Sequence, residues 1–209
     1  MDDRLRLVQW LSPAFPIGGF AYSQGLEEPM ATGLVPDAAG VEQWVRDVLR
    51  LGTPRLDAVV VARTRAGDDP QGLADLLHAM ASSAERAVEL MEQGRAFATL
   101  IAGIHGTAPA IWPYPVAVGL ATRALRVSTP EVLSLLLHGA AAQLVSAATR
   151  FLPLGQTEAQ AILTRLAPLI PELAHEAAAL SVDEVTTFTP GADMAAMRHE
   201  TLEVRIFRT

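Results

Sequence analysis

The chain has 209 residues, half of them hydrophobic, and a formal net charge of −7 at pH 7. It contains no Cys, and all 16 of its basic residues are Arg. Disulfides, thiolate chemistry, Cys-ligated metals, Schiff-base lysines and the lysine of a P-loop are therefore excluded. The acidic balance and the lack of a basic run argue against nucleic-acid binding. We expect a single domain, residues 1–209, with a core that needs no covalent staple.

Membrane insertion is the next question, because two long stretches carry no charge. Residues 96–122 contain three Pro and three Gly and cannot cross a bilayer as one helix. Residues 132–149 are near the lower limit for a span, and we interpret them as a buried core helix. The N-terminus is acidic and lacks the basic start of a secretory signal. We expect a cytoplasmic protein that does not enter the membrane.

The first irregular segment is residues 12–20, Ser-Pro-Ala-Phe-Pro-Ile-Gly-Gly-Phe, which we call the Pro/Gly loop. Its prolines fix φ and its glycines permit conformations closed to other residues, so we predict a shaped loop. The next residues, 21–25, are one position short of the Gly-x-Ser-x-Gly motif of serine hydrolases. That motif needs a strand before the serine. We therefore interpret Ser23 as a helix N-cap.

Helical patterns dominate the rest of the chain and predict an all-α, single-domain bundle of about ten helices. Capping side chains and first-turn prolines mark the predicted helix starts near Asp37, at Asp69-Pro70, at Thr129-Pro130, at a capping box over 157–160, and at Pro171. Residues 85–104 show one apolar face opposite Arg86, Glu89, Glu92 and Gln93, which we predict to be solvated. The C-terminal residues 201–209 alternate apolar and charged side chains, a strand-like pattern in an extended tail.

Possible metal ligands are few. Glu-x-x-His at 172–175 and Asp-x-x-His at 75–78 place a carboxylate and an imidazole on one helix face, but a di-metal bundle needs two further carboxylates. His105 and His138 lie in apolar segments and suggest hydrogen-bonded core histidines. His199 is a weak candidate for nickel, and an interface residue is the simpler interpretation. We predict no catalytic residues, no resident metal and no cofactor.

Three stretches, taken together, resemble the urease accessory protein UreF family. The first runs from Trp10 through the Pro/Gly loop to Glu27, the second is 150–157 with Gln160, and the third is 193–200 leading into Arg-Ile-Phe-Arg at 205–208. Their order and spacing extend the resemblance over essentially the whole chain. Some members carry His where this chain has Gln24, so no metal or proton-transfer role is carried over to that residue.

The resemblance implies an all-α homodimer that bridges the accessory protein UreD (UreH in some organisms) and the nickel-binding GTPase UreG on apo-urease. Such a protein regulates GTP-dependent nickel delivery without being an enzyme. The residues expected to contact partners lie in the three motifs: Phe15, Pro16, Gly18, Gly19, Phe20, Tyr22, Ser23, Gly25, Glu27, Arg150, Pro153, Gly155, Gln156, Thr157, Arg198, His199, Glu200, Arg205, Phe207 and Arg208.

We expect the Pro/Gly loop and the tail to dock on UreD, with Arg150, Arg198, Arg205 and Arg208 donating at interfaces. The alternative for these arginines is a set of salt bridges within the chain that hold the tail down. Two other functions stay open: a helical carboxylate/His metal-binding protein and a peripheral scaffold unrelated to urease.

Overall fold

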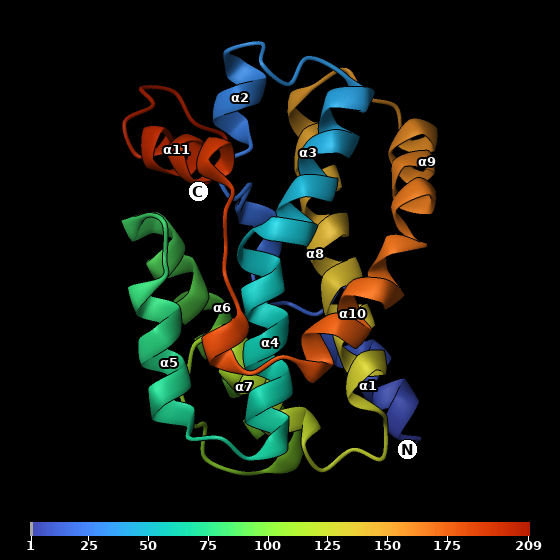
Figure 1. Cartoon of the computed structure of the whole chain (residues 1–209), viewed down its shortest axis with the longest axis vertical. Helices are drawn as coiled ribbons and strands as arrows, with labels where there is room; N and C mark the ends of the chain where they lie inside the picture. Colours follow the sequence, from blue (N-terminus) through green and yellow to red (C-terminus); the bar gives the residue numbers. More distant parts are fainter. Residues whose placement is uncertain (1) are drawn as a thin grey trace.

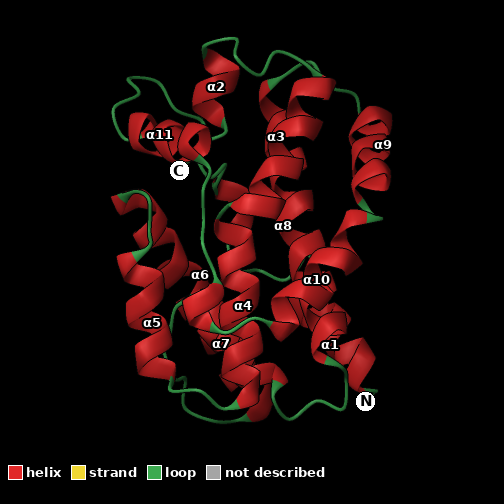
Figure 2. Ribbon diagram, viewed as in Figure 1, coloured by secondary structure: helices red, strands yellow, loops and turns green. Residues whose placement is uncertain are grey.

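The computed structural model describes residues 2–209, and within this range the chain is helical with no β-strand (Figure 2). The all-α prediction is confirmed, with eleven α-helices in the described range where about ten were expected. They are α1 (Asp3–Leu11), α2 (Glu27–Ala31), α3 (Ala38–Leu51), α4 (Thr53–Ala66), α5 (Pro70–Ala79), α6 (Ala84–His105), α7 (Tyr114–Thr122), α8 (Thr129–Phe151), α9 (Gln156–Leu166), α10 (Leu169–Ala179) and α11 (Pro190–His199). Two short 3-10 segments are η1 (Gly19–Ala21) and η2 (Val182–Glu184).

Helices α4 and α8 pack against each other in the middle of the molecule (Figure 1). Around this pair, α8 also contacts α3, α9 and α10, while α4 contacts α3, α7 and α10. Helix α6 lies against α7, and α2 and α11 pack on each other at one end. The C-terminus lies near that end, and the N-terminus lies at the opposite one (Figure 1).

Helix α8 is the central helix of the apolar core. Its buried residues recur every three or four positions, which places them on the faces turned toward its neighbours: Leu133, Leu137, Ala141, Leu144 and Ala148. The helix is long and apolar enough to cross a membrane by composition alone. Its described side chains are nevertheless buried or half-buried except at three polar positions, His138, Ser146 and Arg150. This placement is that of a core helix and does not by itself indicate a membrane protein.

Two of the five predicted helix starts stand as predicted. Asp37 caps α3 by accepting from the Gly40 N–H, and Asp69 caps α5. The other three are corrected. Helix α10 begins at Leu169, two residues before the predicted Pro171. Ser128 caps α8 in place of the predicted Thr129. The predicted capping box over 157–160 is absent, because α9 begins at Gln156 and has Gly155 at its N-cap. A Ser181–Glu184 box opens η2 instead.

The charge pattern of α6 led to a wrong prediction. Its start and end agree with the sequence, but Arg86, Glu89 and Gln93 are buried, with exposed fractions of 5%, 0% and 4%. The face that was predicted to be solvated is covered by other parts of the chain. Amphipathic patterning assumes that polar residues face water, and it fails where they pair with one another inside the fold.

The tail also departs from its pattern. Residues 201–209 form no strand; they follow α11 as an irregular segment that lies across the molecule. A strand needs a continuous ladder of backbone hydrogen bonds with a neighbour. Here the backbone partners are one short turn and one carboxylate, so no ladder forms.

Candidate functional site

The C-terminal tail, residues 200–209, is fixed by backbone hydrogen bonds to the turn that precedes α2. The Arg208 N–H donates to the Ala21 carbonyl at 2.8 Å, and the Ser23 N–H donates to the Thr209 carbonyl at 2.6 Å. The Ser23 hydroxyl donates to the same carbonyl at 2.6 Å. The tail, the turn 21–27 and the first half of α6 meet here, and we call this region the tail junction.

The Glu27 carboxylate is the second anchor of the tail. It accepts from the backbone N–H groups of Ile206 at 2.7 Å and Phe207 at 3.0 Å. Glu27 is only 1% exposed, and its own N–H donates to the Ser23 hydroxyl at 3.2 Å. A buried carboxylate that accepts from backbone amides is well satisfied, so Glu27 takes the place of a missing β-ladder partner.

His199 joins the tail junction to α6. It is fully buried, with Nε2 at 3.1 Å from Glu27 Oε2 and Nδ1 at 2.8 Å from Glu85 Oε2. A neutral imidazole carries one N–H, whereas the imidazolium can donate to both carboxylates. Because both nitrogens already face carboxylates, a metal ion would have to displace one of them. Within residues 2–209, no group of three or more potential metal ligands is found.

The two arginines near the C-terminus pair with α6. Arg205 is ion-paired with Glu85, and Arg208 pairs with Glu92 at 2.7 Å. The Tyr22 hydroxyl also donates to Glu92, and both burial and this carboxylate raise the pKa of Tyr22. The Tyr22 hydrogen bond and then the Arg208 guanidinium lower the pKa of the Glu92 carboxyl. These contacts support the alternative in which the arginines hold the tail to its own chain.

The other two arginines of the motifs also have partners within the chain. The Arg150 guanidinium lies 4.5 Å above the ring of the buried Phe207 and donates to the Phe20 carbonyl. Arg198 is 3.5 Å from Glu28, and its side chain is 59% exposed. Arg198 is therefore the freer of the two to contact another molecule.

A buried ionic cluster lies beneath the tail. Arg86 contacts Asp57 of α4 at 2.6 Å and Glu89 at 3.0 Å. Glu89 also accepts from the side-chain amides of Gln93 at 2.9 Å and Gln24 at 3.2 Å. Burial raises the pKa of Asp57 to about 6, although Arg86 opposes the shift. The sequence did not reveal this cluster as a unit.

The turn that carries Gln24 needs an unusual backbone. Gln24 has φ 54 and Gly25 has φ 81, both in the left-handed region. A Cβ at Gly25 would lie 2.6 Å from the backbone nitrogen of Ala196 in α11. Gly25 is therefore required for close packing of α11 on this turn.

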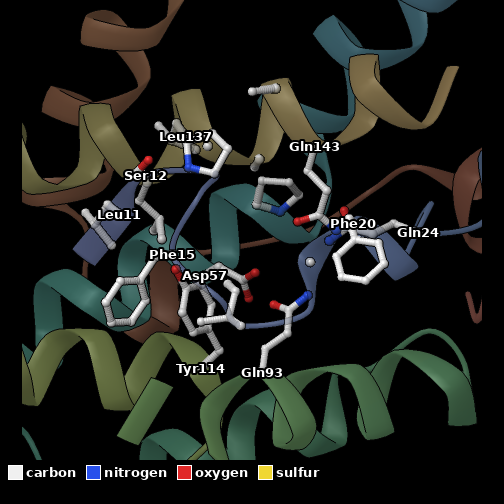
Figure 3. Close-up of a pocket in the computed structure, with 18 of the residues that line it drawn as sticks. Leu11, Ser12, Phe15, Phe20, Gln24, Asp57, Gln93, Tyr114, Leu137 and Gln143 are labelled. Carbon is white, nitrogen blue, oxygen red and sulfur yellow. The ribbon is translucent and has the colours of Figure 1, made fainter. Parts of the chain in front are cut away.

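Next to the cluster, a cavity of about 140 Å³ lies beneath the Pro/Gly loop. Figure 3 shows Asp57, Gln93 and Tyr114 gathered at one side of the cavity, with Leu137 and Gln143 of α8 at the other. The loop is thus a shaped cover, as its prolines and glycines predicted.

The structure gathers half of the predicted partner residues at the tail junction. The tail junction contains Tyr22, Ser23, Gly25, Glu27, Arg205, Phe207 and Arg208 with His199, Phe20 and Arg150 at its border. Glu200 accepts from the Ala84 N–H at 2.8 Å and so caps α6. Phe15 packs in the core against Phe97, while Pro16, Gly18 and Gly19 shape the loop. Pro153, Gly155, Gln156 and Thr157 form the exposed entry to α9, away from the tail contacts.

The residues missed from the sequence are the acidic partners on α6. Glu85, Glu89 and Glu92 follow one another at i, i+4 and i+7, which aligns them on one helix face. This stripe faces the arginines and the histidine of the last eleven residues. The sequence does contain a signal for this pairing: one helix carries an acidic stripe, and the end of the chain is cationic.

The other candidate residues do not form sites. Glu172 and His175 are exposed on α10, and Asp75 and His78 are exposed on α5. His105 and His138 were expected in the core, but both are exposed; they lie on the outer faces of α6 and α8. The Ser23 hydroxyl is buried, donates to the Thr209 carbonyl and accepts from the Glu27 N–H. The N-cap of α2 is Leu26, so the interpretation of Ser23 as the N-cap is corrected.

The tail junction exposes several apolar side chains beside its paired charged groups. Val204 is 85% exposed, Phe20 73%, Ile206 60% and Val88 50%. Val88 lies on α6 between the two glutamates that pair with Arg205 and Arg208. Exposed apolar side chains on an ordered segment are typical of an interface.

Comparisons with known proteins agree on one family. The family model described as UreF matches residues 35–167. A urease accessory protein UreF from Cereibacter sphaeroides is 56% identical over 205 residues, which cover 98% of both chains. Relatives of the same name from Paracoccus denitrificans and Dinoroseobacter shibae are 46% and 45% identical, over 99% of this chain and 96% and 98% of theirs. The matches to relatives include the Pro/Gly loop and the tail.

Proposed function

The chain belongs to the UreF family of urease accessory proteins, and from this premise we propose that it bridges UreD (UreH) and the GTPase UreG during urease maturation. Membership in the family supports an accessory, non-catalytic role alongside other urease accessory proteins. In the proposed mechanism the chain regulates GTP-dependent delivery of nickel to apo-urease. It forms a homodimer in the assembly and holds no nickel of its own.

The observation that carries the proposal is the apolar surface presented by the tail junction. Val204 and Ile206 are exposed although the backbone at Ile206, Phe207 and Arg208 is hydrogen-bonded. Ordering a segment before binding lowers the entropic cost of association. A terminus that is held in place and yet exposes apolar side chains is suited to a protein partner. We assign this surface to UreD.

The contacts of Arg205 and Phe207 within the chain make these two residues unsuitable for testing the proposal. Replacing Arg205 and Phe207 together would remove an ion pair with Glu85 and a side chain that is only 3% exposed. Loss of partner binding in that variant would not distinguish a lost contact from an undocked tail. Substitutions at Val204 and Ile206 avoid this problem, because these side chains point away from the fold.

The experiment is co-expression of the chain with UreD and UreG from the same source, followed by size-exclusion chromatography with light scattering. The wild-type chain should co-elute with both partners as a complex of two copies each. Val204→Ser with Ile206→Ser should lose UreD while the helical content by circular dichroism is unchanged.

Ile104→Ser is the matched control. Ile104 is 54% exposed, close to the 60% of Ile206, but it lies at the far end of α6 from Glu85. This control should bind UreD as the wild type does. A wild-type chain that elutes alone in the presence of both partners would refute the bridging role. If only the Val204/Ile206 variant binds normally, the bridge stands and our choice of surface is wrong.

A further inference from the structure

The cavity beneath the Pro/Gly loop is not explained by the proposed partner surface, because Val204 and Ile206 do not line it. Its volume of about 140 Å³ is similar to that of an engineered cavity, roughly 150 Å³, that binds benzene. The cavity therefore has room for a planar group of that size. Its walls are mostly apolar and its floor is polar, which is the usual composition of a ligand site.

The polar side of the cavity has more carboxylates than cations. Asp57 and Glu89 are two carboxylates that share the single guanidinium of Arg86. Asp57 and Arg86 line the cavity, and Glu89 lies directly behind them. Apart from the phenol of Tyr114, the other lining residues, including those from α8 and the Pro/Gly loop, carry no ionisable group. A cation in the cavity would balance the second carboxylate, and a buried charge without a partner is costly.

The polar atoms that face this space are mainly acceptors. Arg86 hydrogen-bonds Oδ2 of Asp57, and we find no partner for Oδ1 within residues 2–209. Gln24 uses its side-chain N–H for Glu89, and its Oε1 is buried with no hydrogen-bond partner in that same range. Tyr114 adds a hydroxyl at the cavity wall. An unpaired buried acceptor is costly, so a ligand that donates hydrogen bonds is favoured here.

We propose that this cavity is a binding site for a guanidinium group, with the Asp57 carboxylate as its main acceptor. A guanidinium is planar, cationic and donates in several directions, which matches the acceptors of Asp57 and Gln24. Phe15 and Phe20 are among the lining residues, and a guanidinium is attracted to aromatic rings. An anion would be repelled by the carboxylate excess. A transition metal would find no imidazole among the lining residues.

Two sources supply this chemistry, a free guanidinium compound and an arginine side chain of another protein. The first test uses the isolated chain and methylguanidinium as the probe. Three of the chain's eight Gln line the cavity, at 24, 93 and 143, and the chain has no Asn. Their side-chain amide signals in ¹H–¹⁵N spectra therefore report directly on the site. We expect saturable shifts of these three signals with methylguanidinium and none with tetramethylammonium, which has the charge but no N–H.

The variants separate the cavity from general effects of the salt. Asp57→Asn should weaken binding about tenfold or more, as expected for the loss of a charged hydrogen bond. Asp75→Asn, on the exposed face of α5, is the matched control and should bind as the wild type does. Because Asp57→Asn removes half of a buried ion pair, Ala140→Leu provides a second variant. It fills the cavity from α8 without changing a charge, and it should also abolish the shifts.

The pH dependence gives a separate measure. Burial raises the pKa of Asp57 to about 6, and the ionisable groups that face it are Arg86, Glu89 and Tyr114. Above that pH the carboxylate is charged and attracts the cation; below it, protonation removes the charge. Methylguanidinium should therefore bind more weakly as the pH falls through 6.

Several results would overturn the proposal: no saturable shift, shifts that survive both Asp57→Asn and Ala140→Leu, or the same shifts with Ni²⁺ or Mg²⁺ in place of methylguanidinium.

Once binding is seen, competition identifies the source. If methylguanidinium releases UreD or UreG from the complex, the natural ligand is a partner's arginine. If the complex is unaffected, it is a free guanidinium compound. Only the competition experiment rests on the proposed function. If the chain does not bind UreD or UreG, the result for methylguanidinium binding to the isolated chain still stands.

Discussion

The apolar core along α8 and the tail junction are held by different interactions. In the core, Leu133, Leu137 and Leu144 are 0–1% exposed and belong to one cluster of buried apolar side chains. In the tail junction, Glu27, Glu89 and His199 are equally buried, but each makes polar contacts. One region is stabilised by the removal of apolar surface from water. The other depends on matched charges in fixed geometry.

This difference has a consequence for how each region fails. Apolar packing is roughly proportional to area and degrades gradually when a side chain is trimmed. A buried ionic network is satisfied only as a whole, because each missing partner leaves a charge without compensation. The tail junction is therefore the region where single substitutions, pH and partners can release a segment. The core around α8 provides the rigid support for it.

The largest effect is expected at Arg86. Arg86→Met keeps most of the apolar volume but leaves Asp57 and Glu89 buried without a cation. Breaking a buried ion pair in this way costs about 3–5 kcal/mol, which urea denaturation will measure. Arg46→Met is the control, since Arg46 forms a partly exposed pair with Glu42 within α3, and pairs near the surface are worth about 0–1 kcal/mol. Equal losses in the two variants would show that the cluster is not a stabilising unit.

A similar loss is expected in the core, with a different dependence on conditions. Leu144 is 1% exposed on α8, and Leu144→Ala should cost about 2–5 kcal/mol through lost burial and a residual cavity. This loss should be the same at every pH at which the chain folds, because no ionisable group is involved. Leu34→Ala, at a position that is 70% exposed, should stay within about 0.5 kcal/mol. A loss that varied with pH would mean that the core and the tail junction are coupled.

The same contrast explains which parts could be predicted from the sequence. Helix α8 and the caps at Asp37 and Asp69 follow from local signals, because spacing and capping act within one turn. The motifs in the Pro/Gly loop and the tail identified the family, and the relatives bear this out.

What the sequence concealed is long-range charge pairing. Glu89 looked solvated because its partners Gln24 and Thr209 are 65 and 120 residues away. His199 looked like an interface residue for the same reason, since Glu27 and Glu85 are 172 and 114 residues away. Periodicity describes one helix at a time and carries no information about what covers it. The partner roles of the predicted residues stay predictions until complexes are measured.

The smallest global effect, and the most specific local one, is expected at His199. The two imidazole nitrogens face Glu27 and Glu85, and the single side-chain amide of glutamine cannot reach both carboxylates, so the Glu27 acceptor of the Ile206 and Phe207 amides is held less firmly. We expect His199→Gln to cost about 1–3 kcal/mol of global stability, in the range for a charged hydrogen bond. Hydrogen exchange at residues 201–209 should accelerate far more than in α8, because a docked segment can open without unfolding the core. His175→Gln, at an exposed position of α10, should change neither. Exchange in the tail that stays slow in His199→Gln would show that Arg205, Arg208 and the Thr209 carbonyl contacts hold the tail without the histidine. The tail junction would then be a set of independent contacts and not one network.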